Sequence, residues 1–348
     1  MIIQSGCSTA GILDRSGKRF GSEEIVSAMK VMNERNNGLG GGFAVYGLYP
    51  DNKNDYAFHI LYNSELARDQ TEIFLEKMFK VVGHDKIPCE EKFGAPLIER
   101  YFLKVPKKNL VNIDEESYVV HCVDRINSEI LGTFVMSSGK NMGIFKGLGY
   151  PGEVAEFYKL DQYKGHMWIG HGRFPTNTPG SWFGAHPFGL LDLSVVHNGE
   201  VSSYGANKRF LESFGYHCSL KTDTEVFIYL LDLLLRRHKL PLKTACNVLA
   251  PPFWSLPKSP EEKKELEIIR RIYAGAIVNG PFSIIVGHKG GMFGLNDRIK
   301  LRPMVAAEKD NLFFIASEES ALKKSYGSFD RLWAAEAGNP VEGDLDVQ

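Results

Sequence analysis

Five short blocks of this chain carry the side chains that could do chemistry. The first begins with Cys7, a thiol at the start of a predicted strand over 7–13, where it could act as a nucleophile or fill space in the core. The other four combine histidine, arginine, asparagine and acidic residues, and they begin at His171, Ala185, Val196 and Lys221. Metal binding and nucleophilic catalysis are both open to these residue types, so the blocks have to be interpreted together.

The elements that position these blocks are strands and helices, and along the chain they form separate groups of strands and of helices. Short apolar runs bounded by turn residues predict strands over 43–46, 56–62, 101–105, 118–123, 167–169, 193–196, 276–278, 282–286, 292–295 and 312–316. Apolar residues at helical spacing predict helices over 22–35, 71–82 and 224–237. Thr222 or Asp223 can cap the last helix, and Glu225 lies in its first turn. This arrangement predicts an α+β fold with antiparallel sheets.

Composition and charge exclude several classes of partner. The 348 residues carry 41 basic and 42 acidic side chains, so no net field draws the chain to nucleic acid or an anionic membrane. The longest apolar run, 228–235, is too short to span a bilayer, and residues 1–6 lack the features of a secretory signal. The five cysteines are scattered and lack C-x-x-C spacing, which disfavours disulfides, structural zinc and an iron–sulfur cluster in this chain. We therefore expect a cytoplasmic protein that binds neither nucleic acid nor membrane.

In their order along the chain, the five blocks resemble the class II, or N-terminal nucleophile, glutamine amidotransferases. The run from His171 to Thr178, followed by Ser181 and Trp182, is most similar to the glutaminase domain of glutamate synthase. Three later segments fit the same domain: 279–282, 301–304 and 316–318. Two further segments resemble the stand-alone amidotransferase subunit of archaeal-type glutamate synthases: 135–142 and 147–150.

The resemblance implies a four-layer αββα sandwich of the N-terminal nucleophile hydrolase type. Residues 7–348 would form this class II domain, with an extra segment at about 83–165, and residues 1–6 would be a propeptide. In the family the nucleophile becomes residue one after processing and is commonly followed by glycine and an apolar residue. Here six residues precede Cys7, and Ser8 and Thr9 follow it. We expect cleavage between Gly6 and Cys7, without which glutaminase activity would be absent or feeble.

By the same resemblance, Cys7 is the catalytic nucleophile. Its α-amine, a group whose pKa is ordinarily roughly 7.7–8.0, would take the thiol proton and later return it to the leaving ammonia. Asn198 and Gly199 match the oxyanion hole of the family, the first through its side-chain amide and the second through its backbone N–H. A plain Asn-Gly turn is the alternative for this pair.

Two charged residues match the positions that bind glutamine in the family. Arg173 would grip the α-carboxylate, and Asp223 would hold the α-ammonium group. A surface ion pair for Arg173 and a helix cap for Asp223 are the alternatives. Thr176 could hydrogen-bond the same amino acid. Because this chemistry needs no metal, we expect no metal or cofactor in the chain, and we expect loop-ordering roles for His171, His186 and His197.

The expected function is hydrolysis of L-glutamine to L-glutamate through a cysteine thioester, with the ammonia passed to a separate glutamate synthase-type subunit. The motifs run from Cys7 to about Ser320 and leave no room for an ammonia-accepting domain. The resemblance therefore places the acceptor, 2-oxoglutarate, on a partner that carries FMN and an iron–sulfur cluster; transfer to form another amino acid is a related option. Two alternatives stay open: a catalytically silent glutamine-binding or regulatory subunit of such a complex, and a hydrolase of another amide.

Overall fold

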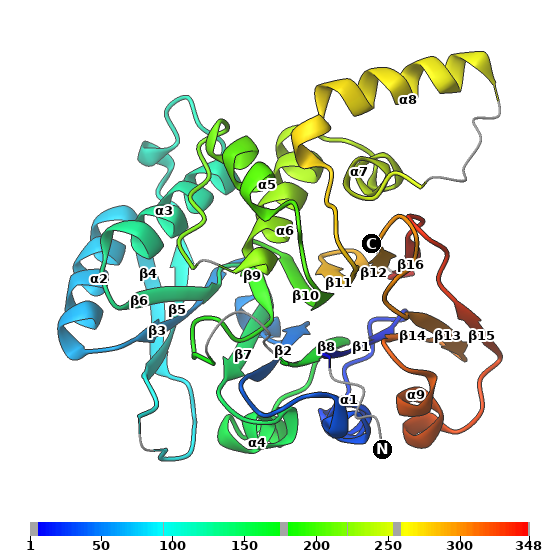
Figure 1. Ribbon diagram of the computed structural model, residues 1–348. Coiled ribbons are helices and arrows are strands. Elements are labelled where there is room, and N and C mark those ends of the chain that lie inside the picture. The colour runs from blue at the N-terminus through cyan, green and yellow to red at the C-terminus, as the bar shows by residue number, and fades with distance from the viewer. Residues whose placement is uncertain (1–5, 93, 175–179, 221, 253–258, 347–348) are drawn as a thin grey trace.

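Two antiparallel sheets lie face to face at the centre of the computed structural model, which describes residues 6–92, 94–174, 180–220, 222–252 and 259–346 (Figure 1). The first sheet has seven strands, in the spatial order β15 (Arg331–Ala334), β13 (Val305–Lys309), β14 (Leu312–Ala316), β1 (Ser8–Asp14), β8 (Met167–Gly172), β2 (Gly41–Tyr46) and β7 (Met142–Gly147). The second has five, in the order β16 (Val341–Asp344), β12 (Gly291–Asn296), β11 (Phe282–His288), β10 (Leu193–Gly199) and β9 (Phe188–Leu190).

Helices cover the outer faces of the two sheets and complete four layers. The seven-stranded sheet is covered by α1 (Glu23–Val31), α4 (Pro151–Phe157) and α9 (Glu319–Tyr326). The five-stranded sheet is covered by α5 (Tyr204–Glu212) and α6 (Asp223–Leu231), beside which lie α7 (Leu242–Leu249) and the projecting α8 (Pro260–Ile272). The expected α+β fold and αββα sandwich are confirmed. None of the helices in the described ranges combines the length and the apolar character that a bilayer span needs.

The central strand β1 is buried along its whole length, because α1 packs on one of its faces and the second sheet on the other. Gly11 lies where the two sheets approach each other closely. A Cβ at this position would lie 2.8 Å from Sδ of Met292, so the missing side chain lets the layers meet. The packing on both faces fixes β1, and it therefore also fixes Cys7, which immediately precedes the strand.

A third sheet forms a separate layer beside the sandwich (Figure 1). Its strands follow the order β4 (Lys80–Lys86), β5 (Leu97–Lys104), β3 (Tyr56–Tyr62) and β6 (Thr133–Ser137), and α2 (Glu65–Met78) and α3 (Glu115–Glu129) pack on it. We call this part of the chain, residues 56–137, the side unit. The predicted extra segment at about 83–165 overlaps the side unit and continues into β7 and α4; its limits relative to other family members stay a prediction.

Two of the predicted elements in the side unit were wrong. The predicted strand over 118–123 lies inside α3, which begins after Asp114, whose Oδ1 accepts a hydrogen bond of 2.9 Å from the backbone N of Ser117. The predicted helix over 71–82 is α2, which starts earlier, at the Ser64 cap, and ends at Met78. Residues 80–86 pair with β5 instead, because sheet pairing outweighs the weak helical pattern at that end.

Candidate functional site

Cys7 lies at the end of β1, where its thiol meets the end of the neighbouring strand β8. The backbone N of Phe174 donates to Sγ at 3.3 Å, and the carbonyl oxygen of the same residue lies 3.9 Å from Sγ. Burial raises the pKa of the Cys7 thiol; the hydrogen bond from Phe174 and the positive charges of Arg173 and Arg302 act against this without cancelling it. In the full chain, with Gly6 attached, the thiol is therefore protonated at neutral pH.

Arg173 follows β8 directly and is only 5% exposed. Its backbone N donates to the carbonyl oxygen of Gly40 at 2.8 Å. Gly40 has φ +148°, and a Cβ there would lie 3.2 Å from Cδ of Arg173, so the glycine makes room for the arginine side chain. Burial lowers the pKa of Arg173, although its interactions with Cys7 and Asp223 act against this. Arg173 is thus a buried cation whose charge acts on both the thiol and the carboxylate.

Asp223 is the first residue of α6, but its carboxylate is turned toward the segment that follows β10. Oδ2 accepts a hydrogen bond of 3.0 Å from the backbone N of Val201, and Oδ1 lies 3.7 Å from Nδ1 of His197. Burial alone would raise the pKa of Asp223, but His197 and the bond from Val201 outweigh it and lower the pKa below its ordinary value. The Asp223 side chain is therefore an anion at neutral pH.

Asn198 and Gly199 end β10 on the five-stranded sheet. The side chain of Asn198 is fully buried, and neither its Oδ1 nor its Nδ2 has a hydrogen-bond partner within the described residues. Gly199 has φ +136°, and a Cβ there would collide with the carbonyl oxygen of Pro281, so no other residue fits. The free amide faces the segment before Cys7, because a Cβ at Gly6 would lie 3.8 Å from Oδ1 of Asn198.

Two arginines that the sequence analysis did not select also surround Gly6. A Cβ on this glycine would lie 3.2 Å from Nη2 of Arg35 and 3.7 Å from Nη1 of Arg302. Arg35 forms an ion pair with Glu318. Arg302 could have been selected from the sequence, because it lies in the segment 301–304 that fits the family pattern. Arg35 follows α1 and lies in none of the segments that resemble the family. Thr176, the remaining predicted residue, lies outside the described residues.

The three histidines of the blocks pack behind this site. His186 and His197 both contact the hydroxyl of Thr224, at 2.6 and 3.1 Å. Nε2 of His171 lies 3.0 Å from the carbonyl oxygen of His197, and the rings of His171 and His186 stack with centroids 4.2 Å apart. Burial lowers the pKa of His171 to about 3 and that of His186 well below its usual range, so these two rings are neutral at pH 7. The cluster ties β8, β10 and α6 together beneath the site.

The structure therefore brings four of the predicted segments to one place. Cys7 and Arg173 come from neighbouring strand ends of the first sheet, whereas Asn198 and Asp223 come from the second sheet and from the helix that covers it. The charges of Arg173 and Asp223 both act on the Cys7 thiol. Chemically, the arrangement combines a nucleophile, an amide donor, a cation and an anion.

Comparison with known proteins identifies the family. The family model of "Glutamine amidotransferases class-II" matches residues 8–326. An uncharacterized protein of Archaeoglobus fulgidus is 46% identical, with 97% of this chain and 92% of that protein covered. The glutamine amidotransferase-like protein GlxB of Rhizobium meliloti is 27% identical over 54% of each chain.

One enzyme and one solved structure show more distant similarity. A glutamine–fructose-6-phosphate aminotransferase of Sulfurisphaera tokodaii is 32% identical over 108 residues, which are 30% of this chain and 18% of that enzyme. The structure of a glutamine phosphoribosylpyrophosphate amidotransferase from B. subtilis aligns with 98% of this chain and 50% of its own, with a TM-score of 0.47 and 13% identity. With the family model matched over nearly the whole chain, this protein belongs to the class II glutamine amidotransferases.

Proposed function

We propose that this protein hydrolyses L-glutamine to L-glutamate and ammonia, with Cys7 as the N-terminal nucleophile after residues 1–6 are removed. The observation that carries the proposal is the convergence of the Cys7 thiol with the buried cation Arg173, the partly exposed anion Asp223 and an amide that lacks any partner within the described protein. A buried amide without hydrogen bonds costs about 1–3 kcal/mol. Such a cost is offset when a substrate supplies the missing partner.

The two charged side chains fit the two charged ends of an amino acid. Arg173 can grip the α-carboxylate in a bidentate manner, and Asp223 can accept from the α-ammonium group. The carboxamide of glutamine then extends to Sγ of Cys7. Attack of the thiolate on the amide carbon forms a tetrahedral intermediate, whose oxyanion would accept from Nδ2 of Asn198 and from the backbone N–H of Gly199. Loss of ammonia leaves a thioester, which water hydrolyses to glutamate.

Removal of Gly6 and the preceding residues would activate the nucleophile. While Gly6 is attached, the nitrogen of Cys7 is a peptide N–H that cannot act as a base. Cleavage would turn it into an α-amine that can take the thiol proton. Gly6 also stands between the Asn198 amide and two arginines, so its departure would open the space beside the thiol.

The departures from the family pattern after Cys7 are accommodated by the surrounding residues. Ser8 is fully buried, and its Oγ accepts a hydrogen bond of 3.2 Å from Nδ2 of Asn36. Opposite it stands Gly172, where a Cβ would lie 2.5 Å from both of these atoms. The Ser8 side chain is therefore directed toward Asn36 and away from the substrate side, which supports an active enzyme after processing.

The acceptor of ammonia is placed on a separate glutamate synthase-type subunit, which would carry FMN and an iron–sulfur cluster and use 2-oxoglutarate. This part of the proposal rests on the sequence resemblance of the blocks. A reducing cytoplasm suits the reaction, because all five cysteines of the chain are free thiols and an oxidised Cys7 could not attack an amide.

A silent glutamine-binding or regulatory subunit is the second candidate function, and a specific observation favours it. Burial raises the pKa of the Cys7 thiol, so the thiol stays protonated unless a base beside it takes the proton. A protein that never loses residues 1–6 would keep Arg173 and Asp223 but would lack the internal base.

Intact mass spectrometry before and after incubation with a glutamine-mimicking diazoketone tests the proposal. We expect a mass that lacks residues 1–6 and gains one adduct. The Cys7→Ala variant should gain none, whereas Cys89→Ala, which removes an exposed cysteine, should still gain one. A full-length mass without an adduct, in protein purified with and without its partner, would favour the silent subunit.

The acceptor needs a separate assay. The processed protein is mixed with a synthase subunit that contains FMN and an iron–sulfur cluster, and glutamate formation from glutamine and 2-oxoglutarate is measured with a reductant. Ammonia release without any transfer to 2-oxoglutarate would retain the glutaminase and reject this partner.

A further inference from the structure

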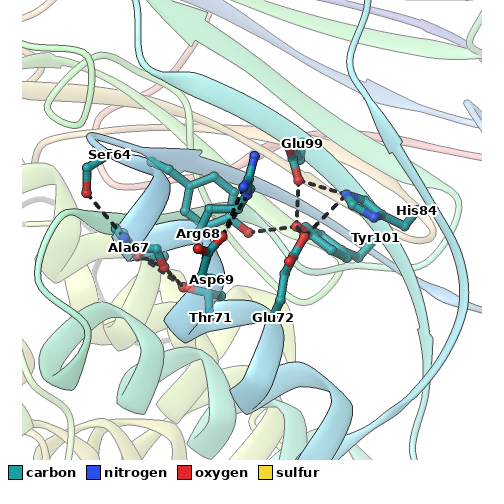
Figure 2. A network of polar contacts seen from close by, with 11 residues as sticks. Ser64, Ala67, Arg68, Asp69, Thr71, Glu72, His84, Glu99 and Tyr101 are labelled. Carbon is teal, nitrogen blue, oxygen red and sulfur yellow. Dashed lines mark hydrogen bonds and ion pairs between the residues drawn. The ribbon is translucent and has the colours of Figure 1, made fainter.

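Three potential metal ligands converge in the side unit, far from the thiol site. Glu72 comes from α2, His84 from β4 and Glu99 from β5, and one ligand atom from each lies within 4.8 Å of the others (Figure 2). Nε2 of His84 is 2.7 Å from Oε2 of Glu99 and 3.9 Å from Oε1 of Glu72. The three side chains point toward one another across the gap between the helix and the sheet.

The cluster has fewer hydrogen-bond donors than its carboxylate oxygens can accept from. The hydroxyl of Tyr101 lies 3.1 Å from Oε1 of Glu72 and 2.7 Å from Oε2 of Glu99, but a phenol has one hydrogen and can donate to only one of them. Tyr62 donates to the same hydroxyl oxygen at 3.2 Å and brings no proton to either carboxylate. When both glutamates are ionised, one carboxylate oxygen therefore faces the Tyr101 oxygen without a hydrogen between them.

The cluster is also short of positive charge. Within 4 Å, His84 is the one basic side chain of the described chain that contacts Glu72 or Glu99. The charge of Arg68 reaches both glutamates, but its guanidinium is already engaged by Asp69 at 2.9 Å and contacts neither of them within 4 Å. Even a protonated imidazole would balance only one of the two glutamates, and Glu99 is only 3% exposed, so its charge is poorly solvated. A bound divalent cation would supply the missing charge.

We propose that Glu72, His84 and Glu99 bind a divalent transition-metal ion of the Zn²⁺ class. One imidazole nitrogen and two carboxylate oxygens form a ligand set typical of zinc, and the imidazole disfavours Mg²⁺ and Ca²⁺. Metal–ligand bonds of about 2.0–2.2 Å require small side-chain rotations from the present separations. The side chains of His84 and Glu72 are 40% and 33% exposed, so an ion can enter from solvent and keep a water ligand.

Tyr101 prepares the site for the ion. Its ring stacks on the imidazole of His84, with centroids 4.3 Å apart and planes 8° apart, which fixes the direction of the ring nitrogen. Its hydroxyl then donates to a ligating carboxylate, the usual arrangement of outer hydrogen bonds around a protein-bound metal. The ion would join α2 to β4 and β5 and so stabilise the side unit. This proposal does not depend on glutaminase activity.

Titration of the full-length chain with Zn²⁺, followed by isothermal calorimetry, tests the site. We expect one ion per chain with micromolar or tighter affinity. Glu72→Gln and His84→Ala should each weaken the affinity at least tenfold and abolish the rise in melting temperature that Zn²⁺ causes. Both changes are at partly exposed side chains, and unchanged melting curves without metal would show that the variants fold.

A matched control separates this site from surface histidines and from cysteines. His217 pairs with Asp124 at 2.9 Å but lies outside the cluster of three ligands, so His217→Ala should bind Zn²⁺ as the parent does. Co²⁺ loaded into the same site should show visible bands without the thiolate charge-transfer band that Cys7 or Cys89 would produce. Equal Zn²⁺ affinity in the parent, Glu72→Gln and His84→Ala, or no stoichiometric binding by the parent, would overturn the proposal.

Discussion

The thiol site and the cluster of the side unit are both polar, but they are incomplete in different ways. At the thiol site Arg173 and Asp223 supply charges of both signs and Arg302 adds a second cation, while the amide of Asn198 has no hydrogen-bond partner within the described residues. In the side unit, His84 and Tyr101 contact both glutamates, while positive charge is lacking.

The difference indicates what each place binds. An unpartnered amide beside a cation and an anion fits a zwitterion that brings its own hydrogen-bonding groups, as glutamine does. The cluster of the side unit has surplus negative charge and few hydrogen-bond donors, which fits the binding of a cation. The positions differ as well, because the thiol site lies where the two sheets of the sandwich meet and the side-unit cluster lies on a separate layer. We therefore expect changes at one place to leave the other intact.

Removal of the nucleophile should have the largest effect. Cys7→Ala takes away the sulfur that would form the thioester in the proposed mechanism, and we expect glutaminase activity to fall on the order of 10⁴-fold or more, as in other enzymes that lose a covalent nucleophile. Ammonia release from glutamine by the processed protein measures it. Cys89→Ala should keep full activity, and substantial turnover by Cys7→Ala would show that another group attacks the amide.

Asn198→Ala should separate catalysis from stability. Loss of one oxyanion donor costs roughly 10²–10³-fold in kcat. The melting temperature should stay the same or rise, because the amide makes no hydrogen bond within the described protein. Asn207 is the matched control: it is equally buried, but its Nδ2 donates to the carbonyl oxygens of Gly275 and Ile277 at 2.8 and 2.9 Å. Asn207→Ala should lower stability by about 1–3 kcal/mol.

A reversed result, with Asn198→Ala unstable and fully active, would make Asn198 a structural residue.

The thiol site was largely predictable because its residues stand in recognisable blocks. The sequence placed Arg173, Asn198 and Asp223 in segments whose order matched a family, and the layered fold followed from the same resemblance. The predicted helix over 224–237 is confirmed as α6, continued by a π-helical turn over Asp232–Arg237. The conformation of Asp223 was not predictable: its carboxylate bonds to Val201 and does not cap its own helix.

The side unit was predicted poorly, for two physical reasons. The run over 118–123 is rich in residues that favour strands. Only the cap at Asp114 and the helical spacing of the buried side chains indicate that this run belongs to the helix α3. The ligand cluster has no sequence pattern at all. It depends on the pairing of β4 with β5, where His84 stands opposite Tyr101 and Lys86 opposite Glu99, and on the packing of α2 above them.

Arg173→Lys should weaken recognition of glutamine while the chemistry is kept. A lysine keeps the charge but loses the bidentate contact, so kcat/KM should fall roughly 10–100-fold, mainly through KM. Steady-state kinetics with glutamine and with an analogue that lacks the α-carboxylate measure the effect. The analogue should be a poor substrate for the parent and should lose little more in the variant. An equal loss with both substrates would mean that Arg173 acts on the reacting amide instead.

The smallest expected effect is a pH dependence at Glu225, behind the thiol site. This side chain is 2% exposed in the first turn of α6, and the backbone N atoms of Ser219 and Leu220 donate to it at 3.1 and 3.0 Å. Burial raises its pKa to about 7, although those bonds and the charge of Lys146 act against the rise. Between the unfolded value of 4.5 and about 7, the folded chain therefore holds a proton that the unfolded chain has released.

The sign of the effect follows from this proton count. The contribution of Glu225 to stability falls as pH rises from about 4.5 to 7 and is constant outside that window. Glu225→Gln cannot titrate, so the difference in melting temperature between the parent and the variant should change by a few °C across the window. Glu76→Gln, at an exposed position of α2, should show no such change. If the difference in melting temperature does not change with pH, Glu225 keeps its charge in the folded protein.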